Sequence, residues 1–146
     1  MHFSNLLKLL VFTCFISGNT FAQSKAVSGP EAECKALLAK GNEVDKQGEY
    51  AEALEYYIKA EAIATKHQLI DELINAKKHI GNVYTKLSNY GEALGYYKEV
   101  LGIVQADGKH VETVPPIFNN IGVIYTQEQD YKTALKYLMQ GHAIAK

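Results

Sequence analysis

The feature that most constrains the fold of this chain is a short pattern that occurs three times at a nearly constant spacing. Each copy has a glycine, a tyrosine further along and then an alanine: Gly41, Tyr50 and Ala53; Gly81, Tyr90 and Ala93; Gly122, Tyr131 and Ala134. The glycines follow one another at steps of 40 (81 − 41) and 41 (122 − 81) residues. A fixed period of this size is typical of stacked supersecondary units. We therefore expect the whole fold to consist of three copies of one unit.

Apolar and small residues within one copy recur at helical spacing. The second copy has two such stripes: Ile74, Ile80, Gly81, Tyr84 and Leu87, then Tyr90, Ala93, Leu94, Tyr97 and Leu101. Steps of about three, four and seven residues indicate amphipathic helices rather than strands. Short polar segments separate the two stripes of each copy: Gln47-Gly48-Glu49, Ser88-Asn89 and Glu128-Gln129-Asp130. Each copy is therefore predicted to be an antiparallel helical hairpin.

The expected fold is all-α, an α–α superhelix, or solenoid, of three hairpins. The helices are expected at about 31–47, 50–66, 71–87, 90–105, 114–127 and 131–145, in repeats at about 34–67, 74–107 and 115–146. Pro115-Pro116 suit the first turn of the fifth helix, with Thr113 as its cap, and Gly108 is expected to end the fourth helix.

The recurring residues also predict how the helices pack. Gly41, Gly81 and Gly122 weaken a helix, so we expect them to permit close approach of the two helices of a hairpin. The alanines are expected to serve the same contact from the second helix. Large rings are expected to fill the space between hairpins: Tyr84, Tyr90, Tyr125 and Tyr131.

The N-terminus differs from the repeats and predicts a cleaved secretory signal peptide over residues 1–22. Lys8 precedes the apolar run Leu9–Ile16, and Thr20-Phe21-Ala22 places small residues before a cleavage point at Gln23. Two alternatives are a membrane anchor, although the run is shorter than the roughly 20 residues of a span, and a lipoprotein modification at Cys14. The mature chain is expected to be periplasmic or secreted, and 23–30 to be a flexible leader.

Composition argues against several classes of function. The net charge is −1 and all fifteen basic residues are lysines, which does not favour nucleic-acid binding. Once the signal peptide is removed, Cys34 is the single cysteine and cannot form an internal disulfide. Histidines 67, 79, 110 and 142 lack metal-ligand spacing, and no catalytic motif is present. We therefore expect no enzyme activity, no cofactor and no metal.

The repeated residues carry a family resemblance. The copies share these positions: Phe118, Ile121-Gly122 and Tyr125; Ile80-Gly81, Tyr84, Ala93 and Tyr97; Gly41, Ala53, Tyr57 and Ala60. Over about residues 34–146 the chain resembles a tetratricopeptide repeat protein. Its period exceeds the usual 34 residues and is similar to that of the longer-repeat subgroup of kinesin light chains and bacterial regulators and sensors. The resemblance implies a scaffold that binds peptide or protein partners on a concave helical face.

Asparagines at equivalent positions are the candidate binding residues. Asn42 and Asn82 each follow a repeat glycine, and we expect them to share the concave face with Asn75, Lys78 and Asn119. An asparagine amide can pair with both the N–H and the C=O of an extended peptide, so a row of amides could bind a peptide backbone. The alternative, that Asn42 and Asn82 bond to neighbouring backbone or to each other, is equally open.

The last predicted helix has an apolar stripe with no predicted helix after it: Leu135, Leu138, Met139 and Ile144. Arrays of this kind normally close with a polar capping helix. Either the array continues, or this edge self-associates or meets another chain. A second hypothesis is therefore that the repeats are the sensory region of a truncated signal-transduction protein of the histidine kinase or DNA-binding regulator type.

Overall fold

The computed structural model describes residues 29–145, and every regular element in that range is helical. It contains α1 (Pro30–Lys46), α2 (Tyr50–His67), α3 (Ile70–Lys86), α4 (Tyr90–Asp107), the 3-10 turn η1 (Val111–Thr113), α5 (Val114–Gln127) and α6 (Tyr131–Ile144). The predicted all-α fold is confirmed, and each helix end lies within two residues of its expected place. Helix α1 begins at Pro30, the last residue of the predicted leader. Residues 23–28 of the predicted leader and the predicted signal peptide lie outside the described residues.

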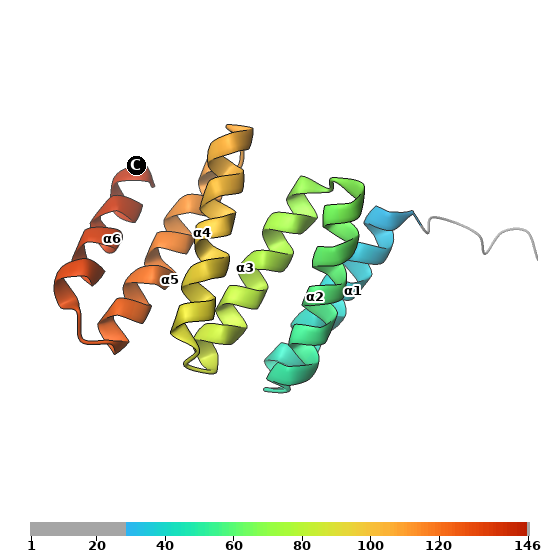
Figure 1. Cartoon of the computed structure of the whole chain (residues 1–146), viewed down its shortest axis with the longest axis horizontal. Coiled ribbons are helices and arrows are strands. Elements are labelled where there is room, and N and C mark those ends of the chain that lie inside the picture. The colour runs from blue at the N-terminus through green and yellow to red at the C-terminus, as the bar shows by residue number, and fades with distance from the viewer. Residues whose placement is uncertain (1–28, 146) are drawn as a thin grey trace, which may run out of the picture.

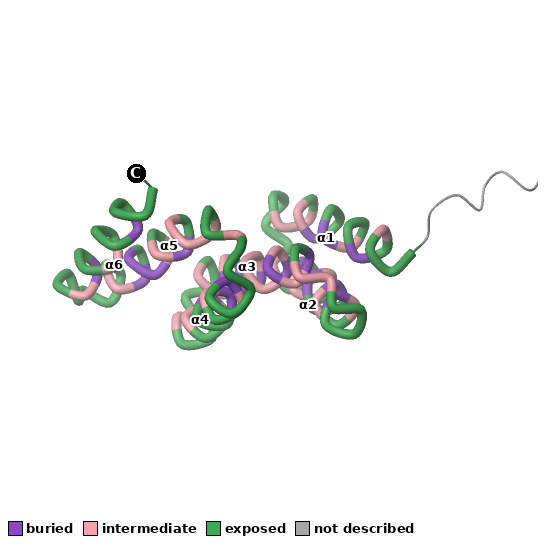
Figure 2. Tube along the Cα trace, turned by 90° about the horizontal axis from the view of Figure 1, so that it is seen from above, coloured by how far each residue is buried: buried purple, intermediate pink, exposed green. Residues whose placement is uncertain are grey.

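The helices form three consecutive hairpins, α1–α2, α3–α4 and α5–α6, along the long axis of the molecule (Figure 1). Seen from above, α1, α3 and α5 lie along one side of the array, and α2 and α4 lie along the other (Figure 2). Helices α1 and α5 rise on either side of α3, so the surface that these three helices share is concave. We call it the concave face.

Each hairpin reverses at a residue with a positive φ angle at the same place in the repeat. Gly48 has φ 84°, Ser88 59° and Gln129 63°, and left-handed residues of this kind commonly end helices. The expected role of Gly108 is confirmed, since it ends α4 with φ 67°. Thr113 occupies the cap position of α5, but its side chain makes no capping hydrogen bond because η1 already leads the backbone into the helix.

The repeat glycines bring the two helices of each hairpin together, as predicted. A Cβ atom on Gly41 would lie 2.5 Å from Cε1 of Tyr57, and one on Gly81 would lie 2.7 Å from Cε1 of Tyr97. In the third hairpin a Cβ on Gly122 would lie 2.7 Å from Cγ of Leu138. The absence of a side chain therefore makes room for a large side chain of the opposite helix.

Replacing Gly81 with alanine is expected to lower the free energy of unfolding by about 1–3 kcal/mol, the usual cost of overpacking a filled core. The buried Tyr97 ring cannot shift away from an added methyl group without disturbing the hydrogen bonds of its hydroxyl. Gly95 is the matched control, since a Cβ there meets nothing within 4 Å and alanine should stabilise α4 by up to about 1 kcal/mol. Urea unfolding followed by circular dichroism measures the unfolding free energy of both variants. Equal changes for Gly81→Ala and Gly95→Ala would contradict this packing.

The core consists of two clusters, each spanning a hairpin and the first helix of the next. Helices α1, α2 and α3 build the first cluster around Tyr57 and Ile80, and α3, α4 and α5 build the second around Tyr97 and Ile121. Tyr84 packs against both clusters, as expected of a ring between hairpins. The prediction for Tyr131 was wrong: its side chain is 65% exposed, because no described helix follows α6 to cover it. Leu87 is also exposed, since it lies in the turn after α3.

Ion pairs add to the contacts between successive hairpins. Nζ of Lys77 on α3 lies 2.5 Å from Oε1 of Glu61 on α2 and 2.5 Å from Oε2 of Glu99 on α4. On the other side of α3, Nζ of Lys86 lies 2.6 Å from Oδ2 of Asp45 on α1. Helix α3 thus forms ion pairs with three neighbouring helices, and these pairs stabilise the packing of the first two hairpins.

Candidate functional site

Two buried tyrosines orient the equivalent asparagines Asn42 on α1 and Asn82 on α3. The Tyr57 hydroxyl donates a hydrogen bond to Oδ1 of Asn42 at 2.7 Å, and the Tyr97 hydroxyl donates to Oδ1 of Asn82 at 2.8 Å. Both rings are fully buried beneath the repeat glycines. Burial raises the pKa of both phenols, so they remain protonated donors at neutral pH. The repeat glycine, the tyrosine and the asparagine therefore form one unit that fixes an amide at the surface.

Each of these units is also contacted by the next hairpin along the chain. The contacting residue lies two positions before the repeat glycine of that next hairpin. In the third hairpin that residue is Asn120, whose Nδ2 donates to Oδ1 of Asn82 at 2.9 Å. In the second hairpin it is His79, whose ring stacks on Tyr57 with a centroid separation of 5.0 Å and an interplanar angle of 13°. Burial, with Lys78 adding to it, lowers the pKa of His79 to about 4, so the imidazole is neutral at pH 7. Both contacts join one hairpin to the next at the concave face.

The structure bears on both interpretations of Asn42 and Asn82. The side-chain carbonyl oxygens of both residues accept hydrogen bonds from within the protein. Oδ1 of Asn82 accepts from both Tyr97 and Asn120. A carbonyl oxygen has two lone pairs, so Asn82 has no acceptor left for a peptide N–H. The amide NH₂ groups point away from these bonds. Two-sided pairing of Asn82 with a peptide backbone is therefore not available, whereas donation to a peptide carbonyl is.

The other three predicted residues lie in different surroundings. Asn75 and Lys78 are neighbours on α3, with Nζ of Lys78 donating to Oδ1 of Asn75 at 3.1 Å. Asn119 is exposed and lines, with Pro115 and Leu138, a groove between α5 and α6. Asn119 as a binding residue stays a prediction, and the residue of α5 that contacts Asn82 is its neighbour Asn120. The repeat pattern could have indicated Asn120, because Asn120 and His79 occupy equivalent positions. Each lies two residues before its repeat glycine, Gly122 or Gly81.

A shallow pocket lies beside the second unit. It encloses about 240 Å³ and is lined by Asn82, Thr85, Lys86, Tyr97, Asn120 and Val123. Oγ1 of Thr85 lies 3.2 Å from the Tyr97 hydroxyl, and Lys86 is paired with Asp45. The pocket thus combines amide donors, a partly neutralised cation and one apolar wall, which suits a peptide side chain and its adjacent carbonyl group.

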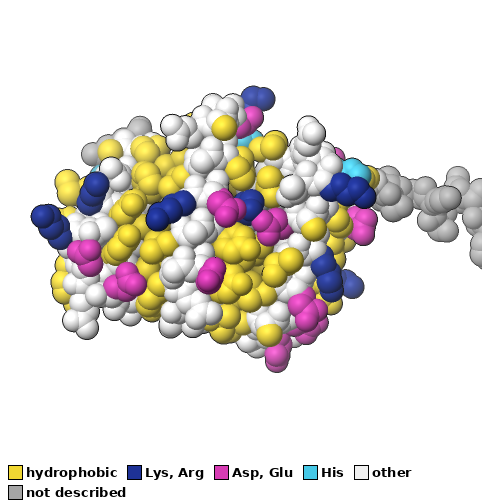
Figure 3. Space-filling view, viewed as in Figure 1, with side chains coloured by type: hydrophobic (Ala, Val, Ile, Leu, Met, Phe, Trp, Pro, Cys, Tyr) yellow, Lys and Arg dark blue, Asp and Glu magenta, His cyan; other side chains and the backbone are white. Residues whose placement is uncertain are grey.

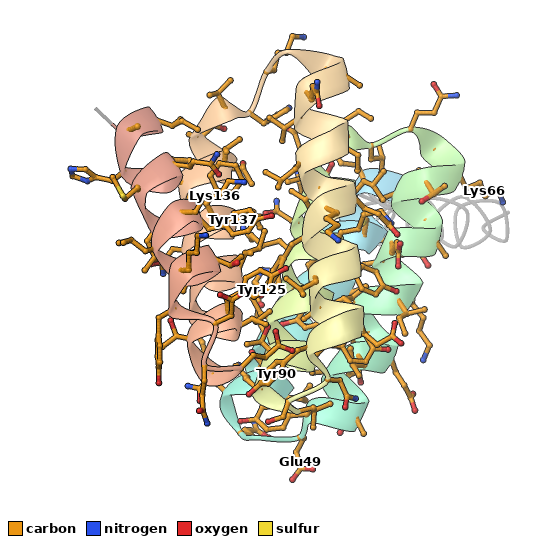
Figure 4. All side chains as sticks on the ribbon, turned by 60° about the vertical axis from the view of Figure 1, so that its left-hand side comes forward. Glu49, Lys66, Tyr90, Tyr125, Lys136 and Tyr137 are labelled. Atoms are coloured by element: carbon orange, nitrogen blue, oxygen red, sulfur yellow. The ribbon has the colours of Figure 1, made fainter. Side chains whose placement is uncertain are left out.

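Aromatic stacking recurs inside the second and third hairpins. The rings of Tyr84 and Tyr96 stack with centroids 5.9 Å apart, and those of Tyr125 and Tyr137 stack with centroids 5.7 Å apart. Figure 4 shows Tyr125 and Tyr137 close together in the third hairpin. Both stacked pairs join the two helices of one hairpin, whereas Tyr84 and Tyr125 were expected between hairpins. Tyr84 makes contacts of both kinds, because it also packs against both core clusters.

Within residues 29–145, no cluster of three or more His, Cys, Asp or Glu side chains could hold a metal ion. None of the six α-helices is both long and apolar enough to cross a membrane. Cys34 is fully buried, its thiol donates to the carbonyl oxygen of Ala60 at 3.3 Å, and burial raises the pKa of the thiol.

Known proteins resemble this chain in sequence and in structure. The human protein "Intraflagellar transport protein 88 homolog" is 31% identical over 86 residues, which is 59% of this chain, and the chain spans only 10% of that protein's length. The crystal structure of the TPR domain of Arabidopsis FLU matches with a TM-score of 0.74 at 21% identity, over 79% of this chain and 96% of that domain. This second likeness shows the fold alone. BtubC (BKLC) from P. vanneervenii matches with a TM-score of 0.73 at 26% identity, over 84% of this chain and 50% of that one.

The sequence profile described as tetratricopeptide repeat matches residues 72–146, just over half of the chain. The matched region contains most of the second hairpin and all of the third, and the first hairpin repeats the same glycine–tyrosine contact. This chain belongs to the tetratricopeptide repeat family.

Proposed function

We propose that this chain is a non-catalytic protein–protein interaction scaffold that binds an extended peptide segment along its concave face. Tetratricopeptide repeat proteins bind proteins or peptides. The observation that carries the proposal is the set of oriented amides Asn42, Asn82 and Asn120, two of them fixed by buried tyrosine hydroxyls. Nucleic acid is not the expected partner, because the chain has no arginine and a net charge of −1.

The binding mode follows from which amide atoms remain available. The NH₂ groups of Asn42 and Asn82 donate to carbonyl groups of the peptide backbone, which makes recognition tolerant of peptide sequence. Because the tyrosines already hold both amides, little side-chain entropy is lost on binding. The pocket beside Asn82 accepts one peptide side chain, and Lys78 on the same helix favours an acidic residue in the peptide.

Replacing Asn82 with aspartate is expected to weaken peptide binding about tenfold or more, because a hydrogen-bond donor becomes a carboxylate facing a peptide carbonyl. The carboxylate still accepts from Tyr97 and Asn120, so the hairpins should keep their contacts. Asn89→Asp is the matched control, since Asn89 lies in a turn and its side chain makes no capping bond. Peptide arrays probed with each variant measure the effect. If Asn82→Asp and Asn42→Asp together leave all peptide binding unchanged, the amides are not the binding groups.

We also propose that the chain is exported, on the basis of the pattern in residues 1–22. Mass spectrometry of the protein purified from its native cells should find an N-terminus at Gln23. An intact Met1 end in the cell interior would contradict export, and a lipid on Cys14 would favour the alternative of a lipoprotein.

The longer-repeat type is proposed on the period of 40 and 41 residues and on the lengths of the first four helices, which have 17 or 18 residues each. The second hypothesis, a sensory region of a longer signalling protein, stays a prediction. The exposed apolar side chains of α6 favour it, and a reading frame that continues past codon 146 into an output domain would support it.

A further inference from the structure

The outer surface of α6 exposes apolar side chains in a continuous stripe. Tyr131, Leu135 and Leu138 are 65%, 58% and 38% exposed, and they follow one another at helical spacing. Apolar atoms also gather over α5 and α6 in the space-filling view, at the left-hand end of the molecule (Figure 3). We call these three residues the α6 stripe.

The equivalent positions in the first two hairpins are covered by the next hairpin. Tyr50, Leu54 and Tyr57 on α2 belong to the core cluster shared with α3. Nζ of Lys86 on α3 lies 5.4 Å from the Tyr50 ring centroid, and His79 stacks on Tyr57. Tyr90, Leu94 and Tyr97 on α4 are likewise part of the cluster shared with α5. The α6 stripe is therefore the equivalent docking surface, and no helix within residues 29–145 covers it.

The helices that cover these surfaces share one apolar pattern. Helix α3 contributes Leu73, Ala76, Ile80 and Val83 to the first cluster, and α5 contributes Val114, Ile117, Ile121 and Ile124 to the second. The spacing in both is three, four and three residues. The same positions on α1 are Glu33, Ala36, Lys40 and Glu43, and all four are exposed. Among the described helices, α1 thus has a polar outer surface and α6 an apolar one.

A second copy of this chain does not match the α6 stripe. Its α1 surface is charged, and its α3 and α5 surfaces are already buried. Two α6 helices facing each other would bring together like charges, because α6 contains Lys132 and Lys136 but no acidic residue. Figure 4 shows Lys136 on this helix. The same lysines favour a partner with acidic side chains beside its apolar surface.

We propose that the α6 stripe is a docking site for an amphipathic helix of a partner protein. The helix carries apolar residues at the three, four, three spacing of α3 and α5, and acidic residues on the side that faces Lys132 and Lys136. An open surface hollow of about 540 Å³ on α6, lined by Leu138, Met139, His142 and Ala143, accepts one of its side chains. This surface is separate from the concave face, so a peptide and a helical partner can be bound at once.

The test uses the full chain and a designed, fluorescently labelled helical peptide with isoleucine at the four apolar positions and glutamate on the flanking positions. Fluorescence anisotropy should show binding that weakens by at least about tenfold, or ~1.4 kcal/mol, in the variant Leu135→Glu. Ile58→Glu is the matched control, because Ile58 is an exposed apolar residue on α2 outside the corresponding stripe. A peptide with lysine in place of glutamate should bind several times more weakly than the acidic one.

Three results would overturn the proposal. The acidic peptide does not bind, the acidic and basic peptides bind with equal affinity, or Leu135→Glu leaves the affinity unchanged. Because Leu135 is largely exposed, the variant should keep the circular dichroism spectrum and melting temperature of the parent chain. Sedimentation velocity gives an independent check: a dimer of the parent chain that Leu135→Glu dissociates would assign the stripe to a second copy instead.

Discussion

Replacing Tyr97 with alanine is expected to lower the free energy of unfolding by about 3–5 kcal/mol, the range for removing a large buried ring. The ring is fully buried and fills the space beneath Gly81. It also belongs to the cluster that joins α3, α4 and α5, so its loss weakens both a hairpin and the contact to the next hairpin. Tyr131→Ala removes the same atoms from an exposed position and should change stability by no more than about 0.5 kcal/mol.

The variant Tyr97→Phe separates the contribution of the ring from that of its hydroxyl. It keeps the buried ring and removes the hydrogen bond to Asn82. The free energy of unfolding is therefore expected to fall by only about 1 kcal/mol. Peptide binding should weaken as well, because Asn82 then loses one of the two bonds that orient it. Urea unfolding of the three variants gives the stabilities. Unchanged peptide affinity in Tyr97→Phe would show that the hydroxyl does not position the amide.

The second large effect concerns acidification, which is expected to destabilise the fold through His79. Burial lowers the pKa of this histidine to about 4 in the folded protein, against about 6.5 in the unfolded chain. Between these two values the unfolded chain binds more protons, so stability falls as the pH is lowered from about 6.5 to 4. One pKa unit corresponds to about 1.36 kcal/mol, so the loss from this single group is roughly 3 kcal/mol.

His79→Phe isolates this effect, because phenylalanine keeps a ring to stack on Tyr57 but does not titrate. The difference in unfolding free energy between parent and variant should change by roughly 3 kcal/mol between pH 7 and pH 4. His67→Phe, at an exposed position near the end of α2, should show a much smaller difference. If the two variants have the same pH profile, His79 does not carry the pH dependence.

The sequence was sufficient to predict contacts that depend on local spacing. The recurring glycines predict that Gly81 lies against the second helix of its hairpin, and it does, but the side chain that meets it is Tyr97 rather than the expected Ala93. The six helix positions were also predicted, because polar turns and helical periodicity define them. The placement of Asn42 and Asn82 on one face follows from their equal distance to the repeat glycines.

The tertiary structure decided the contacts between hairpins. Whether Asn119 or Asn120 meets Asn82 depends on how far α5 is rotated relative to α3, and adjacent residues on a helix point about 100° apart. Tyr131 was expected to pack between hairpins, yet it is exposed. Its burial would require a further helix beside α6, and the described residues contain none. The sequence by itself thus determined the hairpin, since its contacts lie within one repeat. Only the folded array decided which amide oxygens are occupied and which helix surface stays exposed, because those depend on where neighbouring hairpins lie.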